Sequence, residues 1–262
     1  MEIKIDYTKS AHENAGDYYD RAKRLVQKRA GAEKAIKELE RSLREAEKKA
    51  LEKRQELRKV IDTNREWYES FHWFRTSEGL LAIGGRDARQ NELMNSRHFS
   101  DNDLFFHADV FGASVFILKD GLGAGRDSRE ETAHFAACYS SAWASGTRSA
   151  DVYAMRREQV SKSTGKGSLG TGSFLLKGER EWYRNVPLRL SFGLIKGKLN
   201  AIPSIESGRM EVTGWVNVAQ GELKKSDAAK QIAKMLNYND IDYIMRQLPP
   251  AGGFSVTLKK ES

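Results

Sequence analysis

A histidine and an aspartate stand two residues apart in His107-Ala108-Asp109, inside a polar stretch with large apolar residues on both sides. Neighbours two apart on a strand point to the same face, so the imidazole and the carboxylate could hold a metal ion or act as an acid–base pair. No third metal ligand is evident, because the other histidines are scattered along the chain. We favour a structural histidine at a strand end, with Asp109 bonding the turn around Gly112.

The sequence Gly84-Gly85-Arg86-Asp87 opens the same stretch and ends in a second pair of opposite charges. Arg86 and Asp87 could form a catalytic pair, but an aspartate that caps the amides of a helix start explains the pattern more simply. The run Gln90-Asn91-Glu92 is expected to hydrogen-bond to neighbouring loops. No serine sits in a nucleophile elbow, and no activated cysteine is suggested. The sequence thus predicts a binding protein rather than an enzyme, with no cofactor and no metal.

Residues 159–167 form a loop that is rich in hydrogen-bond donors. The loop contains Lys162 and Lys166 but no acidic residue, and backbone amides and lysines in such a loop can hold phosphates. Residues 165–170 match the letters of a dinucleotide-binding fingerprint, but residues 171–176 have the pattern of a strand, whereas the fingerprint requires a helix there. Two interpretations stay open: a phosphate-binding loop, which we favour, and an ordinary mobile hairpin loop.

The positive charge of the chain is concentrated in one segment. Residues 20–60 hold 15 of the 44 basic and 8 of the 36 acidic residues, which accounts for +7 of the net charge of +8. A focused positive segment favours a polyanionic partner such as nucleic acid, although a solvated, lysine-rich helix is the plainer alternative. The single cysteine excludes internal disulfides, and no apolar run is long enough to span a membrane. We expect a soluble cytoplasmic protein without a signal peptide.

Residues 10–71 predict one long helix. Apolar residues recur with an alternating spacing of four and three, as in Ile36, Leu39 and Leu43, and form a nearly unbroken heptad seam. A helix of this length cannot bury such a seam against a globular domain, and the chain offers no second segment of matching length. The pattern therefore predicts one half of a coiled coil, whose partner helix is missing or is supplied by a second chain. Residues 1–9 are expected to hold a short strand.

From residue 72 onward the period of the apolar residues changes to that of strands. The predicted strands span residues 71–75, 80–83, 104–107, 114–119, 152–156, 172–177, 188–195, 199–205, 210–218 and 254–258. The predicted helices span residues 86–97, 128–144, 227–236 and 241–247, with Ser128-x-x-Glu131 as a capping box and Ser226 as a cap. This order indicates an α+β fold: a mixed or mostly antiparallel sheet domain with packed helices, preceded by a long coiled-coil helix.

Four motifs, in a fixed order, resemble the NFACT-R domain. They are Gly84-Gly85-Arg86-Asp87-Ala88-x-x-Asn91-Glu92 after Trp73-Phe74, then His107-Ala108-Asp109-x-x-Gly112-Ala113-Ser114, then Ala137-x-Tyr139-Ser140-x-Ala142-Trp143, and Gln159-Val160-Ser161-Lys162 through Gly170-Thr171-Gly172-Ser173-Phe174. Residues 7–71 resemble the second coiled-coil arm of the same family. These are the nuclear-export-mediator-like and fibronectin-binding-protein-like NFACT proteins of ribosome quality control.

The resemblance implies binding rather than chemistry. Members of the family recognise large ribosomal subunits blocked by peptidyl-tRNA, recruit aminoacyl-tRNA, support C-terminal tailing of the nascent chain and, in eukaryotes, help to position a ubiquitin ligase. The expected partners are therefore the large ribosomal subunit, tRNA and rRNA. The residues expected to contact nucleic acid are Arg86, Arg89, Arg97, His107, Lys162 and Lys166. The residues expected to shape the motifs are Gly84, Gly85, Asp87, Asn91, Glu92, Asp109, Gly112, Gln159, Ser161 and Gly172.

The N-terminal domains and the first coiled-coil arm of the family have no counterpart in this sequence. The expected organisation is a strand remnant of a middle domain in residues 1–9, a basic coiled-coil arm in residues 10–71, and an NFACT-R-like domain with a C-terminal extension in residues 72–262. We expect a C-terminal fragment or one half of a split gene. Two alternatives to an RNA-binding module stay open: a protein-interaction scaffold, and a tRNA-modifying or hydrolytic enzyme around His107, Asp109 and Arg86.

Overall fold

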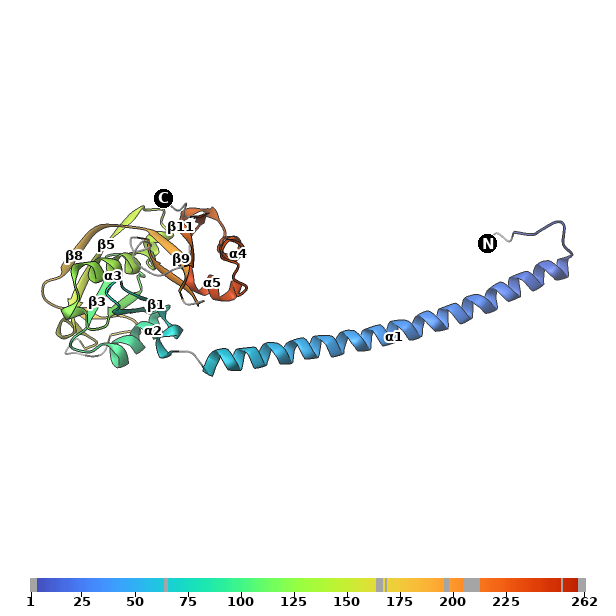
Figure 1. Cartoon of the computed structure of the whole chain (residues 1–262), viewed down its shortest axis with the longest axis horizontal. Coiled ribbons are helices and arrows are strands. Elements are labelled where there is room, and N and C mark those ends of the chain that lie inside the picture. Colours follow the sequence, from blue (N-terminus) through green and yellow to red (C-terminus); the bar gives the residue numbers. More distant parts are fainter. Residues whose placement is uncertain are drawn as a thin grey trace. The chain divides into compact units, whose positions relative to one another are not determined.

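The computed structural model describes residues 4–63, 66–163, 167, 169–195, 198–204, 213–250 and 252–258, except for the side chains of residues 50–63 and 213. The chain divides into two units, Met1–Glu66 and Trp67–Ser262. The first unit consists mainly of one helix, and the second holds the sheets and the shorter helices (Figure 1). Among the described helices, none combines the length and the hydropathy that crossing a membrane requires.

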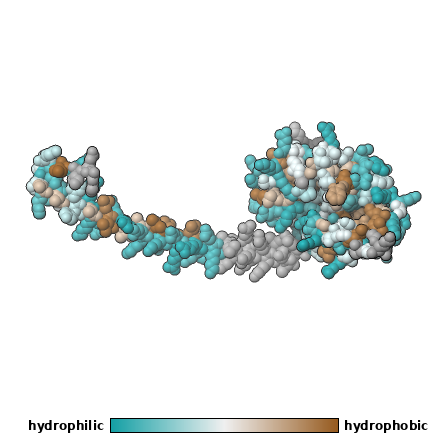
Figure 2. All heavy atoms as spheres, turned by 180° about the vertical axis from the view of Figure 1, so that it is seen from behind, coloured by the Kyte–Doolittle hydropathy of each residue, from teal (hydrophilic) through white to brown (hydrophobic). Residues whose placement is uncertain are grey.

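The helix of the first unit, α1 (Ala11–Thr63), has 53 residues. At 1.5 Å per residue it is about 80 Å long. The predicted seam lies open, because Ile36 is 55%, Leu39 is 68% and Leu43 is 60% exposed. Figure 2 shows brown, apolar patches between hydrophilic side chains along the helix. The long helix is therefore confirmed, with the exposed apolar seam expected of a coiled-coil arm.

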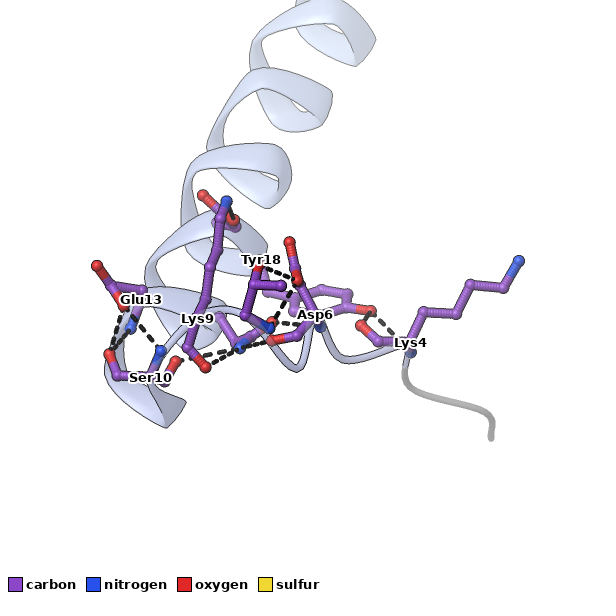
Figure 3. A network of polar contacts seen from close by, with 9 residues as sticks. Lys4, Asp6, Lys9, Ser10, Glu13 and Tyr18 are labelled. Carbon is purple, nitrogen blue, oxygen red and sulfur yellow. Dashed lines mark hydrogen bonds and ion pairs between the residues drawn. The ribbon is translucent and has the colours of Figure 1, made fainter.

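Residues 4–9 contain a turn rather than the predicted strand, and residues 1–3 lie outside the described part. The Tyr18 hydroxyl accepts a hydrogen bond from the Lys4 amide (3.0 Å) and donates one to the Lys4 carbonyl (2.7 Å; Figure 3). The Asn14 side chain does the same with the Asp6 amide (2.8 Å) and carbonyl (2.9 Å). Side chains of α1 thus take the backbone groups that a neighbouring strand would pair with.

A capping box starts α1. The Ser10 amide donates to Glu13 Oε2 (2.8 Å), and the Glu13 amide donates to Ser10 Oγ (3.3 Å). This reciprocal pair satisfies two backbone amides at the helix N-terminus. An ion pair between Lys9 and Asp17 (2.7 Å) lies beside it (Figure 3).

Six antiparallel strands form the main sheet of the second unit, in the order β1-β2-β4-β3-β5-β8. Their bounds are β1 His72–Arg75, β2 Leu81–Gly84, β3 Leu104–Ala108, β4 Val115–Leu118, β5 Ser149–Arg156 and β8 Glu181–Pro187. The sequence predicts all of them except β8. Most residues of β8 are exposed or half-buried on an edge of the sheet, so that its apolar alternation is weak.

A second antiparallel sheet has the order β10-β9-β11-β12. Its strands are β9 Arg189–Ile195, β10 Lys198–Pro203, β11 Thr213–Leu223 and β12 Phe254–Leu258, and a separate short pair joins β6 Val160–Ser161 to β7 Leu175–Leu176. The strand predicted for residues 172–177 is therefore shorter than expected, and residues 205 and 210–212 of two other predicted strands lie outside the description. Every described strand pair is antiparallel, which confirms the α+β class.

The helices of the second unit are α2 Ala88–Leu93, followed by a π-helical turn (Met94–His98), α3 Arg126–Cys138, α4 Lys225–Leu236 and α5 Ile241–Gln247; short 3₁₀ turns cover Trp67–Ser70, Gly121–Gly123, Ser141–Trp143 and Arg157–Gln159. The predicted helix over residues 128–144 ends earlier, at Cys138. The Ser226 cap is wrong, because Ser226 lies inside α4, whose N-cap is Lys224.

The capping box predicted for Ser128 and Glu131 is also wrong. Gly125 is the N-cap of α3. Glu131 instead accepts hydrogen bonds from the amide (2.8 Å) and the hydroxyl of Ser77, and Ser128 Oγ donates to Thr76 Oγ1 (2.8 Å). Both side chains therefore fasten the turn between β1 and β2 to α3.

The main sheet buries apolar residues on both faces. On one face, Phe135 of α3 packs against Phe74 and Phe116, with ring centroids 4.6 and 5.4 Å apart, and this core continues into the second sheet, α4 and α5. The opposite face carries Phe105 and Tyr153, and a second cluster from the α2 region and the β6–β7 loop covers part of it. This second face holds most of the predicted site residues.

Candidate nucleic-acid interface

The first motif forms a tight junction between β2 and α2. A Cβ atom on Gly84 would lie 2.1 Å from Phe116 Cε1, and one on Gly85 would lie 2.1 Å from Asn91 Oδ1. Asn91 is buried and accepts a hydrogen bond from the Val115 amide (3.2 Å), which joins α2 to β4. The two glycines and the asparagine therefore shape the junction, because a side chain at Gly84 would clash with β4 and one at Gly85 would clash with α2.

The charged residues of this motif divide into anchored and open ones. Asp87 is the N-cap of α2 and accepts from the Gln90 amide (2.8 Å), as predicted. Arg86 Nη2 donates to the Phe71 carbonyl (2.9 Å), so its guanidinium is held beside the start of β1. Arg89 and Arg97 are exposed, and neither has an ion-pair partner among the residues that the structure describes. These two arginines are free to meet a phosphate.

The Lys162 ammonium is held by contacts within the protein. Its Nζ donates to Glu92 Oε2 (3.1 Å) and to the carbonyls of Gly170 (2.7 Å) and Ser173 (3.4 Å), and it lies 5.5 Å from the centre of the Phe174 ring. The Glu92 side chain also accepts from the Gly172 amide (3.2 Å), and the hydrogen bond from Lys162 lowers the pKa of Glu92. The pair therefore fastens the loop to α2, so Lys162 anchors the loop in this structure, and its expected contact with a phosphate stays a prediction.

Other loop residues also hold the loop itself. Gln159 Nε2 donates to the Glu179 carbonyl (2.7 Å), while its Oε1 accepts from the Arg156 amide (2.7 Å). Ser161 Oγ accepts from the Ser163 amide (3.1 Å). Gly172 has a positive φ of 77°, and a Cβ atom there would lie 2.7 Å from Cβ of Ala88 on α2. Lys166 lies outside the described residues.

His107 and Asp109 meet different partners at the end of β3. His107 Nδ1 lies 3.3 Å from the Tyr153 hydroxyl, and burial lowers the pKa of His107. Asp109 makes no hydrogen bond to the Gly112 turn within the described part of the chain, which corrects that prediction; its Oδ1 lies 3.8 Å from Arg180 Nη1. The turn instead relies on Gly112 itself, whose φ is 76°. Among the described residues, no group of three His, Cys, Asp or Glu side chains could hold a metal ion.

Two arginines lie over two aromatic rings next to His107. Arg180 Cζ is 4.4 Å from the ring centre of Tyr153 and 5.6 Å from that of Trp182, and Arg184 Cζ is 3.9 Å from Trp182. The two rings contact each other edge to face at 5.4 Å. We call Tyr153, Arg180, Trp182 and Arg184 the β8 strip. The strip and the adjoining His107 thus bring together an imidazole, two guanidinium planes, a phenol and an indole.

The β8 strip is partly neutralised but not covered. Arg184 Nη1 pairs with Asp151 (2.6 Å), yet 56% of the Arg184 side chain and 36% of the Arg180 side chain stay exposed. None of these four residues was predicted as a site residue, and β8, which carries Trp182 and Arg184, was not predicted from the sequence. The signal that could have revealed it is the pair of arginines, Arg180 and Arg184, on either side of two aromatic residues.

Comparisons with known proteins agree with the motifs. Residues 70–178 match the family model of the NFACT protein RNA binding domain. The archaeal Rqc2 homolog aRqcH of Methanocaldococcus jannaschii is 34% identical over 205 residues, covering 75% of this chain and 30% of that protein. The ribosome quality control complex subunit NEMF of Homo sapiens is 32% identical over 192 residues, covering 71% of this chain and 18% of that protein.

A third relative extends the similarity to the helical unit. The ribosome quality control complex subunit 2 of Schizosaccharomyces pombe is 30% identical over 282 residues, covering 99% of this chain and 27% of that protein. The chain thus spans 18% to 30% of the length of these three relatives. The ordered motifs, the α+β fold and these similarities establish the chain as a member of the NFACT family.

Proposed function

We propose that this chain is an RNA-binding module of ribosome quality control, which binds the stalled large ribosomal subunit with its tRNA and supports C-terminal tailing of the nascent chain. The relatives that are named as ribosome quality control subunits support this role, and so does the RNA-binding family model. The module binds and positions RNA and carries no chemistry of its own. The arginines contact phosphates, and the motif glycines and Lys162 shape the surface.

The β8 strip beside His107 is the observation that carries this proposal. Unpaired bases stack on aromatic rings and on guanidinium planes without regard to sequence, and each arginine also attracts phosphate. In the strip the guanidinium groups of Arg180 and Arg184 lie over the rings, so an incoming base meets an arginine plane first. Arg89 and Arg97 supply further positive charge on the same unit.

Binding of fluorescently labelled single-stranded RNA and of large ribosomal subunits, measured over a range of salt concentrations, tests the proposal. Trp182→Ala should weaken RNA binding by about 1–3 kcal/mol, the usual value of one stacked base. Arg180→Ala should lower the slope of log affinity against log salt by about one. Arg126→Ala is the matched control, because this arginine of α3 also pairs with an acid, Glu130 (2.6 Å), but has no aromatic contact among the described residues.

Two results would contradict the proposal. One is RNA binding that does not change with salt, since neutralised phosphates always make affinity salt-dependent. The other is an equal effect of Trp182→Ala and Arg126→Ala, which would place the RNA somewhere other than the β8 strip.

The exposed seam of α1 favours a second role, the docking of a partner helix from another chain. Leu39 and Leu43 lie on this seam and are more than half exposed, and such a stripe normally packs against a second helix. Leu39→Asn combined with Leu43→Asn should abolish association with that partner, as measured by sedimentation equilibrium, whereas Lys37→Asn off the seam should not. If the seam variant and the control associate equally well, both in the presence of ribosomes and as purified chains, this role is excluded.

A further inference from the structure

Five polar side chains from five different places in the second unit converge behind the start of β1. They are His72 at the start of β1, Arg86 after β2, Tyr139 at the end of α3, Lys225 at the start of α4 and Gln247 at the end of α5. No two of them belong to the same element. A group assembled from so many parts of a fold exists only when the whole unit is folded, as ligand sites usually do.

Short contacts hold these side chains together. The rings of His72 and Tyr139 lie 4.0 Å apart, and the Tyr139 hydroxyl donates to the Gln247 carbonyl (2.5 Å). Lys225 Nζ donates to the carbonyl of Leu248, the next residue (3.1 Å). Arg86, in turn, is tied to the carbonyl of the residue before His72. The contacts link the start of β1 and the end of α3 to α4 and α5.

The cluster has hydrogen-bonding capacity that it does not use. His72 and Gln247 are only 5% and 2% exposed. Within the described structure, His72 Nδ1 and Gln247 Nε2 are buried and make no hydrogen bond of regular geometry, although the Gln247 side chain lies close enough to His72 to act on its pKa. Lys225 has no ion-pair partner among the described residues, and its ammonium donates to the Leu248 carbonyl. Unsatisfied buried polar atoms are rare, and they call for a ligand or water.

The cluster is also electropositive. Burial, with the nearby charges of Arg86 and Lys225, holds the pKa of His72 well below its usual value. Burial and the charge of Arg86 likewise lower the pKa of Lys225. Arg86 and Lys225 thus lie near one neutral imidazole, and the charge of each cation destabilises that of the other. A ligand with negative charge and acceptor oxygens would relieve both this repulsion and the unused donors.

We propose that His72, Arg86, Lys225 and Gln247 form a binding site for a phosphate oxyanion. An amide nitrogen, an ammonium and a guanidinium can only donate, and neutral histidine can donate through one ring nitrogen, so the site suits a group that only accepts. Arg86 and Lys225 are half-exposed and His72 and Gln247 lie deeper, so the oxyanion reaches the two cations first. The phosphate belongs either to an RNA backbone or to free phosphate. The site shares no residue with the β8 strip, so it does not depend on the RNA surface proposed there.

Titration calorimetry of inorganic phosphate into the whole chain, with ionic strength held constant by sodium chloride, tests this site. Wild-type protein should bind phosphate with saturation. Lys225→Ala should lose about tenfold or more in affinity, because a charge-assisted hydrogen bond is lost. Lys224→Ala, which removes the exposed neighbouring lysine, should bind like wild type. If Lys225→Ala fails to fold, NMR spectra of the wild-type protein provide the test. The ring resonances of His72 should shift saturably when phosphate is added and should not shift when chloride is added.

A second measurement, with labelled single-stranded RNA, identifies the source of the phosphate. If Lys225→Ala weakens RNA binding and phosphate competes with RNA, the site binds the RNA backbone; if RNA binding is unchanged while phosphate binding is lost, it binds free phosphate. Trp182→Ala should leave phosphate binding unchanged, which separates this site from the β8 strip. The proposal is overturned if wild-type protein shows neither heat nor a saturable His72 shift, or if Lys225→Ala and Lys224→Ala bind phosphate alike.

Discussion

His134 links the stability of the second unit to pH. Its ring is fully buried on α3, and Nε2 donates to the Arg189 carbonyl of β9 at 2.9 Å. Nδ1 is buried without a hydrogen-bond partner among the described residues. Burial is the main cause that lowers the pKa of His134 from 6.5 to about 4. The imidazole is therefore neutral in the folded protein at neutral pH.

The size of the effect can be worked out from this pKa. The unfolded chain takes up a proton on His134 near pH 6.5, whereas the folded chain resists it until about pH 4. The stability that neutral His134 contributes is thus fully present above pH 6.5 and is lost as the pH falls toward 4. Since one pKa unit corresponds to about 1.4 kcal/mol, the free energy of unfolding should fall by about 3 kcal/mol across this window.

Urea unfolding at a series of pH values measures this loss. All five tryptophans lie in the second unit, so their fluorescence reports that unit alone. His134→Gln keeps an amide that can donate to the Arg189 carbonyl but does not titrate. The difference in the free energy of unfolding between wild type and His134→Gln should therefore shrink by about 3 kcal/mol between pH 6.5 and 4. His12→Gln on the exposed surface of α1 should run parallel to wild type.

If the free energy of unfolding changes with pH in the same way for wild type and His134→Gln, this reasoning is refuted. Such a result would mean that the imidazole is already charged in the folded unit, or that it stays buried and neutral in the unfolded one. Carboxylates with lowered pKa, such as that of Asp151, also lose stabilising interactions in acid. Their contribution is common to both proteins and cancels in the difference.

Three further predictions concern the contacts around the motifs. Lys162→Ala and Glu92→Ala remove opposite charges, but each releases the same loop, so both should weaken RNA binding equally in an anisotropy assay. Stronger RNA binding by Glu92→Ala would instead show that Lys162 contacts a phosphate. Gly85→Ala should lower the free energy of unfolding by about 1–3 kcal/mol through overpacking, since its Cβ would lie 2.1 Å from Asn91 Oδ1, and an unchanged urea midpoint would contradict this. Tyr139→Phe should cost about 1–3 kcal/mol by leaving a buried carbonyl of α5 unpaired, and full stability would show that water replaces the hydroxyl.

One short sequence pattern shows how much of the local structure can be predicted from neighbouring residues alone. Ser-x-x-Glu occurs at Ser10 and again at Ser128. The first forms a true capping box, because only solvent and its own helix surround it. The second does not, because Glu131 finds the backbone of Ser77, 54 residues away, across the packed face of α3. Periodicity predicts the main elements, but tertiary contacts decide which side chains are left to cap them.

The binding surface was harder to predict than the fold. Nothing near Lys162 in the sequence reveals its acid partner, since Glu92 precedes it by 70 residues. The β8 strip was missed for a related reason: an edge strand shows little apolar alternation, so Trp182 and Arg184 were not placed on any element. In the Gly84–Glu92 motif, the Asp87 cap was predictable because it is local, whereas the packing of Gly84 against Phe116 depends on a strand that lies 32 residues further along the chain.

β8 is the last strand in the order of the main sheet, so its outer side pairs with no other strand in the part of the chain that the structure describes. Unpaired strand edges of this kind invite pairing with other chains and aggregation. Arg184 places charge on this edge, Asn185 bends it with a left-handed φ of 53°, and Pro187 lacks an amide hydrogen to donate. One of the residues that we assign to RNA recognition, Arg184, therefore also protects this strand edge against pairing with other chains. Replacing Arg184 would therefore have two effects: it would remove a contact to RNA, and it would leave the edge of β8 open to self-association.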